Sequence, residues 1–123
     1  MVIGLSALAL SSAARAHDPR DIWVSLIQII ANPAAFDQKR VGLKGYVILE
    51  FEHQALYLSE ADAKHVITKN GLWLDVSDAI YANRERFHRR YVLVEGTFNA
   101  RLRGHLSLFT GRIENISRFD LLD

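Results

Sequence analysis

The chain has 123 residues, of which 15 are basic, 14 are acidic and none is cysteine, and half are hydrophobic. This composition is typical of one globular domain with a modest core, and it excludes a disulfide-stapled scaffold. The balanced charge also disfavours a nucleic-acid binder, unless the basic residues gather on one face.

The N-terminal segment resembles the later part of a secretory signal peptide. Met1–Ala14 is apolar or small and uncharged, and Ala14-Arg15-Ala16 fits the A-x-A cleavage pattern. The apolar run is too short to cross a membrane as a helix. We therefore expect removal of residues 1–16 and a periplasmic or secreted domain over residues 17–123, the alternative being an apolar helix that packs on the domain. Of the 15 basic residues, removal takes only Arg15, which leaves 14 basic and 14 acidic.

A helix is predicted directly after this segment. Asp18 can accept hydrogen bonds from the first turn, and Pro19 suits the first helical position because its missing N–H is not needed there. Pro33 disfavours helical geometry in the residue before it, so the helix should end near Asn32. Between these limits, apolar residues recur at helical spacing and should cover one open end or side of the domain: Ile22, Trp23, Leu26, Ile27, Ile29 and Ile30.

A short alternating pattern occurs twice, in Val41–Val47 and Val92–Phe98, with a glycine at Gly45 and Gly96. Alternation puts the apolar residues on one face of a strand, and a glycine lets the strand bend sharply. Similar signals predict five strands, at 41–52, 55–59, 72–76, 91–99 and 106–119. In the first strand the inward residues should be Val41, Leu43, Val47, Leu49 and Phe51.

The order of these elements resembles the OB-fold, a five-stranded Greek-key barrel. Three strands are followed by a helix, which Ser77 or Asp78 can cap and which should end near His88, and then by two more strands. The stretch Asn32–Val41 also resembles small exported bacterial OB-fold proteins of unassigned function. The resemblance implies a mainly β domain with an extra N-terminal helix and a helix between strands three and four. The alternatives are another small barrel or an open α+β sheet.

An OB-fold commonly binds ligands on strands two and three, between the loops that join strands 1–2 and 4–5. Tyr57 and Trp73 each lie between two leucines on these strands, so they should point outward and could form a stacking platform. The alternative is that both pack beneath the first helix. Asp75, at the end of the third strand, joins them in the predicted ligand-binding set.

The two loops carry opposite charges. The 4–5 loop has Arg101, Arg103 and His105, which suit an anion, and these residues complete the predicted site. The 1–2 loop has Glu50, Glu52 and His53, and its carboxylates would repel a phosphate backbone. This mixture favours a protein, peptide or small-molecule ligand over nucleic acid.

The strongest basic cluster ends the helix between strands three and four, at Arg84, Arg86, Arg89 and Arg90. Cations there complement the negative end of the helix dipole. The cluster is therefore interpreted as a solvated helix end, the alternative being a patch for an acidic partner, membrane headgroups or nucleic acid.

The sequence carries no motif for metal binding, cofactor binding or catalysis. It predicts a non-catalytic binding module for a protein, peptide or small molecule, without a cofactor. One alternative is a single-stranded nucleic-acid binder that uses Tyr57, Trp73, Arg101 and Arg103. Another is a copper protein, because cleavage after Ala16 would make His17 the N-terminus and offer its amine and imidazole together.

Overall fold

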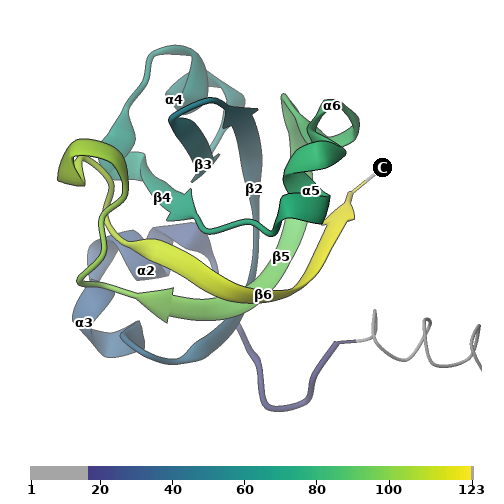
Figure 1. The fold of residues 1–123 in the computed structure, drawn as a ribbon. Helices are drawn as coiled ribbons and strands as arrows, with labels where there is room; N and C mark the ends of the chain where they lie inside the picture. The colour runs from purple at the N-terminus through teal and green to yellow at the C-terminus, as the bar shows by residue number, and fades with distance from the viewer. Residues whose placement is uncertain (1–16, 123) are drawn as a thin grey trace, which may run out of the picture.

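The computed structural model describes residues 17–122, and the predicted signal peptide lies outside them (Figure 1). The described chain is mainly β. Its strands are β1 (Ile22–Trp23), β2 (Arg40–Glu50), β3 (His53–Tyr57), β4 (Gly71–Leu74), β5 (Arg90–Asn99) and β6 (Arg112–Leu121). Its short α-helices are α2 (Leu26–Ala31), α3 (Pro33–Phe36), α4 (Glu60–Lys64), α5 (Asp78–Ala82) and α6 (Arg84–Phe87), and its 3₁₀ helices are η1 (Thr68–Asn70) and η2 (His105–Ser107).

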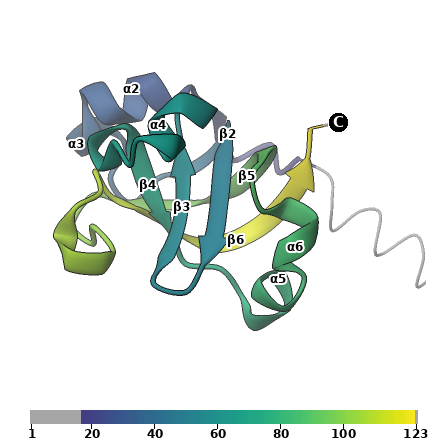
Figure 2. The same ribbon diagram turned by 90° about the horizontal axis from the view of Figure 1, so that it is seen from above.

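All six strands belong to one sheet, in the order β1-β2-β3-β4-β6-β5. A further pairing joins β2 to β5, so that β2, β3, β4, β6 and β5 make a closed circuit of strand pairs. Neighbours pair antiparallel, except that β1 joins β2 and β4 joins β6 in parallel. The two views in Figures 1 and 2 place α2 and α3 on one side of this circuit and α5 and α6 on the other.

The two copies of the repeated pattern lie side by side, as the sequence predicts. β2 and β5 pair antiparallel through eight residue pairs, from Arg40 with Thr97 to Val47 with Arg90. Gly45 lies where β2 passes between β5 and β3. A Cβ on Gly45 would stand 2.7 Å from the Cγ of Leu56 and 2.8 Å from the carbonyl oxygen of Tyr57. Glycine is therefore needed for the close approach of three strands.

The predicted N-terminal helix is wrong in its first half. Asp18 and Pro19 lie in a turn, and Ile22–Trp23 forms β1, which pairs with β2. The helix begins only after Ser25, whose hydroxyl accepts a hydrogen bond from the Gln28 amide, while the Gln28 side chain accepts one from the Ser25 amide. This reciprocal capping box is the stronger helix start. As a result Trp23 is not part of a helical apolar stripe, and its side chain is 52 % exposed.

Three further boundaries differ from the prediction. Phe51 is not inward but lies in the β2–β3 turn, 81 % exposed. The helix that Ser77 caps is split at Asn83 into α5 and α6. The last strand begins at Arg112 rather than at residue 106, because His105–Ser107 forms the 3₁₀ helix η2, in which Leu106 and Ser107 have left-handed backbone angles.

The apolar residues form two clusters on opposite faces of the sheet. The inner cluster contains Leu43, Val47 and Leu49 of β2, as predicted, together with Leu26 and Ile29 of α2. The outer cluster consists of Tyr46, Ile48, Ala55, Tyr57, Ala63 and Phe109.

Tyr57 does point away from the inner core, but it is 0 % exposed, so the predicted open platform is wrong at this residue. Its cover is not the first helix, as the alternative prediction had it. Phe109, from the loop between β5 and β6, lies with its ring centre 6.0 Å from that of Tyr57. A long-range contact from a loop therefore buries a ring that alternation alone would leave exposed.

We expect Gly45→Ala to lower the free energy of unfolding by about 1–3 kcal/mol, the range typical of overpacked sites. The added methyl would meet the backbone of Tyr57, which cannot move away alone. Urea denaturation measures the change. The matched control is Gly42→Ala, whose methyl would meet only side chains, chiefly the exposed Trp23 ring. Equal losses from the two variants would contradict a role for the three-strand crossing.

Candidate functional site

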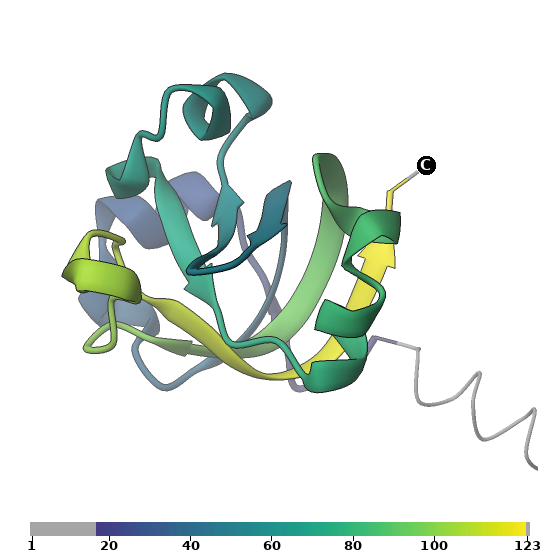
Figure 3. The ribbon, with the colours of Figure 1, turned by 45° about the horizontal axis from the view of Figure 1, so that its top comes forward.

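The loop of residues 100–111, between β5 and β6, is held by hydrogen bonds at both ends. The Asn99 side-chain oxygen accepts from the amides of Arg101 and Leu102. Near the other end, the Thr110 amide donates to the Gly71 carbonyl at 3.1 Å, and the Trp73 amide donates to the Gly111 carbonyl at 2.8 Å. The last two bonds tie the loop to β4. Figure 3 shows the loop beside β4.

Gly104 brings the loop backbone directly onto the Trp73 side chain. Its φ is 72°, and a Cβ at this position would stand 2.6 Å from three side-chain atoms of Trp73, so no other residue fits. The Trp73 ring also makes an edge contact with Phe109, at 5.7 Å between ring centres. Trp73 is thus half-buried, and the backbone at Gly104 covers part of it. It forms a wall of the site rather than an open stacking surface.

The loop and the β2–β3 turn enclose a pocket of about 390 Å³, which we call the Trp73 pocket. It brings together four of the six predicted ligand-binding residues: Trp73, Arg101, Arg103 and His105. The other two do not line it, because Tyr57 is buried and Asp75 lies beyond the end of β4. The remaining lining residues are Glu52, Leu102, Gly104, Ser107 and Arg112.

Arg112 is the functional residue that sequence reasoning missed. The prediction placed it inside the last strand, whereas it is the first residue of β6, where β6 begins to pair with β4 through Trp73. A signal was available in the neighbouring Gly111, which interrupts the alternating pattern there. A loop that continues to Gly111 would have put Arg112 at the mouth of the loop.

The cations of the pocket differ in how far they are neutralised. Arg101 lies 3.8 Å from Asp37, and Arg112 lies 2.7 Å from Glu114. Within residues 17–122, neither Arg103 nor His105 forms an ion pair, and both are exposed. Arg103 is therefore the cation best placed to bind an added anion.

The buried Tyr57 forms a polar pair with His53. The phenol oxygen lies 2.7 Å from Nε2 of His53. Burial raises the pKa of Tyr57 to about 12 and, with His88 nearby, lowers the pKa of His53. The pair is therefore neutral at physiological pH, with the phenol donating to the imidazole. Its role is to satisfy polar groups of the outer cluster.

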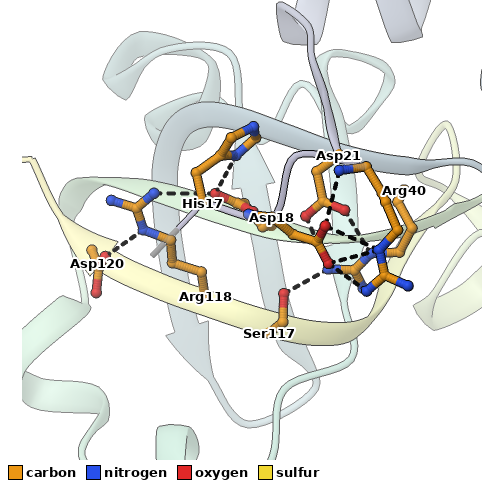
Figure 4. A network of polar contacts seen from close by, with 9 residues as sticks. His17, Asp18, Asp21, Arg40, Ser117, Arg118 and Asp120 are labelled. Atoms are coloured by element: carbon orange, nitrogen blue, oxygen red, sulfur yellow. Dashed lines mark hydrogen bonds and ion pairs between the residues drawn. The ribbon is translucent and has the colours of Figure 1, made fainter. Parts of the chain in front are cut away.

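A second group of charges anchors the N-terminal segment, and Figure 4 shows it from close by. Glu95 is 1 % exposed, and its carboxylate lies 2.9 Å from Nδ1 of His17 and 3.1 Å from a guanidinium nitrogen of Arg118. Asp21 is also buried and accepts two hydrogen bonds from Arg40, at 3.0 and 3.1 Å. Within residues 17–122, no buried side-chain polar atom lacks a partner. This cluster is thus internally satisfied and leaves no group open to a ligand.

Asp21 is ionised within that cluster. Burial by itself would raise the pKa of its carboxyl group, but the hydrogen bonds and the positive charge of Arg40 outweigh burial, and the pKa is lowered. The ion pair with Arg40 therefore ties the segment before α2 to β2. Arg40 also donates to the Ser117 hydroxyl at 2.6 Å, which extends the connection to β6.

His17 contacts two neighbouring side chains in the described structure. Its Nδ1 faces Glu95, and its ring stacks on Trp23 with 4.0 Å between centres. In the described part of the chain, no three His, Cys, Asp or Glu side chains are grouped so that they could hold a metal ion. The copper alternative therefore gains no support from the geometry.

The predicted basic cluster lies on α6, directly after it and at the start of β5, and none of its four arginines lines the Trp73 pocket. All four arginines are exposed. The guanidinium of Arg84 lies 4.6 Å from the centre of the Tyr81 ring, and that of Arg86 lies 5.6 Å from the centre of the Phe87 ring. Aromatic rings thus hold two of the cations in place at the surface.

The chain matches no protein-family model, and comparisons with curated proteins and with solved structures found no match either. Among residues 17–122 no helix is long and apolar enough to span a bilayer.

We expect His53 to make the protein less stable as the pH falls. Because the pKa of His53 is lowered in the folded state, the unfolded chain takes up a proton near the ordinary pKa of 6.5 while the folded protein stays neutral. Stability is then full above this value and decreases towards the lower, folded pKa. Urea denaturation at about pH 7.5 and about pH 5 measures this, with His53→Gln as the non-titrating comparison. An equal pH-dependent loss in wild type and variant would contradict the assignment.

Proposed function

We propose that the protein is an exported, non-catalytic binding module with an OB-fold, and that it binds a small anionic molecule, or the acidic end of a peptide, in the Trp73 pocket. The observation that carries the proposal is the convergence of Arg101, Arg103, His105 and Arg112 around one concave site.

The strand connections support the OB-fold. The circuit β2-β3-β4-β6-β5 is the pairing order that a five-stranded Greek-key barrel needs, with its first strand shared between the second and the fourth. The helical segment α5–α6 connects β4 to β5, where the resemblance places a helix. The Trp73 pocket then borders the third strand through Trp73, with Glu52 from the 1–2 turn and most of its other lining residues from the 4–5 loop, the two loops that flank OB-fold ligands.

The pocket chemistry supports an anion of limited size. Guanidinium groups bind carboxylates and phosphates through paired hydrogen bonds, and Arg103 makes no ion pair within residues 17–122. A volume of about 390 Å³ lies at the lower end of small-molecule sites. Glu52 in the wall would repel a passing phosphate backbone, so we favour a small ligand or a peptide end over single-stranded nucleic acid.

Leu106 and Ser107 add to the support for a binding role. Both have positive φ values, of 56° and 55°, although neither is glycine. Such strained backbone gathers at ligand sites more often than elsewhere. These left-handed angles form the turn at the loop tip that brings Ser107 to the pocket wall.

Export rests on the sequence pattern that ends at Ala16. We expect the protein produced in a Gram-negative host to appear in the periplasmic fraction with His17 as its first residue, because signal peptidase cleaves after A-x-A. N-terminal sequencing of the fractionated protein measures this. Ala16→Pro serves as the comparison and should leave the protein unprocessed. Full-length protein confined to the cytoplasm would contradict export.

We expect the pocket to bind citrate or a glutamate-containing tripeptide with a change in Trp73 fluorescence. The chain has two tryptophans, so Trp23→Phe leaves Trp73 as the reporter. In that background, Arg103→Ser should weaken binding about 10- to 100-fold, the cost of losing a charged hydrogen bond. The matched control is Arg20→Ser, because Arg20 is an exposed arginine that does not line the pocket, and this change should alter the affinity little.

Two outcomes would contradict this proposal. Binding that is insensitive to Arg103→Ser would remove the pocket from consideration. Binding only of an oligothymidylate, with affinity that falls steeply with salt, would favour the nucleic-acid alternative.

A further inference from the structure

One edge of β6 is unpaired over most of its length. β6 pairs with β5 from Arg112 to Leu121, but it pairs with β4 only through Arg112 and Ile113. Within residues 17–122, no other strand pairs with the edge that faces away from β5 beyond Ile113. The circuit of strand pairs is therefore joined only at Arg112 and Ile113 on this side, and the rest of this edge of β6 has no strand beside it within residues 17–122.

The register shows which peptide groups face this open edge. The Leu122 amide donates to the Tyr91 carbonyl at 3.2 Å, so these two residues form a hydrogen-bonded pair that continues the β5–β6 ladder. In an antiparallel ladder, bonded pairs alternate with unbonded ones. Phe119 and Leu121, opposite Val94 and Val92, then direct their N–H and C=O groups away from β5. Backbone groups of this kind are a template for an added strand.

A groove of about 800 Å³ runs along this edge, bounded on its other side by α5 and α6. Ile80 and Phe87 supply an apolar wall, and Phe87 meets Phe119 edge-on at 4.9 Å between ring centres. The groove is lined by residues from both faces of β6, from Ile116 to Leu122. Figure 3 shows α5 and α6 beside the C-terminal half of β6. The space accommodates several residues of an extended chain.

The rim of this groove is basic. Arg86 lines it, Arg84 lies on the same short helix, and Arg89 and Arg90 follow where β5 begins beside the end of β6. Asp120, which also lines the groove, is held by Arg118 at 2.8 Å. Glu85 on α6 and Asp78 at the start of α5 are the exposed acidic groups of the two helices. An acidic partner would gain from this charge, whereas a second copy of the chain would bring the same arginines against it.

We infer that the free edge of β6 binds an extended, acidic segment of a partner protein, which adds a strand to the sheet. Its backbone would pair with the peptide groups of Phe119 and Leu121, and its acidic side chains would meet Arg84 and Arg86. Strand addition of this kind takes affinity from main-chain hydrogen bonds and specificity from flanking side chains. This surface shares no lining residue with the Trp73 pocket.

The test uses fluorescence anisotropy of a labelled peptide of about ten residues in which glutamate alternates with valine, a length that spans the edge. Leu121→Pro removes the outward N–H, and Leu121→Ala is its matched control, because it loses the same side chain but keeps the N–H. We expect Leu121→Pro to weaken binding at least about tenfold and Leu121→Ala less than about threefold. A proline is compatible with an edge position whose N–H does not bond to the neighbouring strand.

A charge reversal tests the same surface without changing the strand. Arg86→Glu should lower the affinity for the acidic peptide at least about tenfold, while Arg20→Glu and Arg103→Ser should leave this affinity unchanged. The same peptide with lysine in place of glutamate should not bind.

Four outcomes would overturn the inference. The first is an equal loss of affinity in Leu121→Pro and Leu121→Ala, and the second is equal binding of the lysine peptide. The third is sedimentation of the peptide-free protein as a dimer that Leu121→Pro dissociates, because the edge would then bind a second copy. The fourth is a loss of peptide binding in Arg103→Ser alone, which would assign the peptide to the Trp73 pocket instead.

Discussion

The structure depends on the pairing of β2 with β5. β2 bonds to β5 through eight residue pairs and, before that pairing ends at Val47, begins to bond to β3 at Tyr46. β2 therefore pairs with both β3 and β5 at neighbouring residues, and this additional pairing completes the circuit of strand pairs. The two faces of the sheet each carry their own apolar cluster. The close approach at Gly45 is the local condition for this arrangement.

The outer face explains why the candidate site is a pocket and not a flat aromatic surface. Phe109 covers Tyr57, and the backbone at Gly104 covers part of Trp73. The loop therefore packs on these aromatic rings, and the polar side chains of the loop are the groups that remain exposed. The exposed groups around the pocket are therefore guanidinium groups rather than stacking surfaces, and this is the basis of the anion binding that we propose.

Charges in this protein fall into two groups. Those around Glu95 and Asp21 are buried and fully partnered, and they join the N-terminal segment to β2, β5 and β6. Buried charges need such partners, because an unpaired one costs several kcal/mol. The arginines of α6 and of the loop remain at the surface, where binding can use them. The distinction between anchoring and binding charges follows from burial, which composition does not reveal.

The sequence by itself determined the two paired strands β2 and β5, because the alternation in Val41–Val47 and Val92–Phe98 can bury one face only as extended chain. It also determined which loop carries Arg101, Arg103 and His105. Short-range signals were sufficient for these features. They were ambiguous before α2, where both Asp18 and Ser25 can cap a helix and the pairing of β1 with β2 decided between them.

Only the tertiary structure decided what each side chain of the site can reach. Tyr57 and Trp73 occupy equivalent outward positions in the sequence pattern, yet Tyr57 is buried and Trp73 remains half-exposed. Phe109, which lies more than thirty residues further along the chain, contacts both rings through the fold of its loop, but Tyr57 is also enclosed by His53 and by the buried cluster that includes Ala63 of α4. Alternation specifies the face of a strand on which a residue lies, but the contact that covers that face is long-range, and no local pattern encodes it.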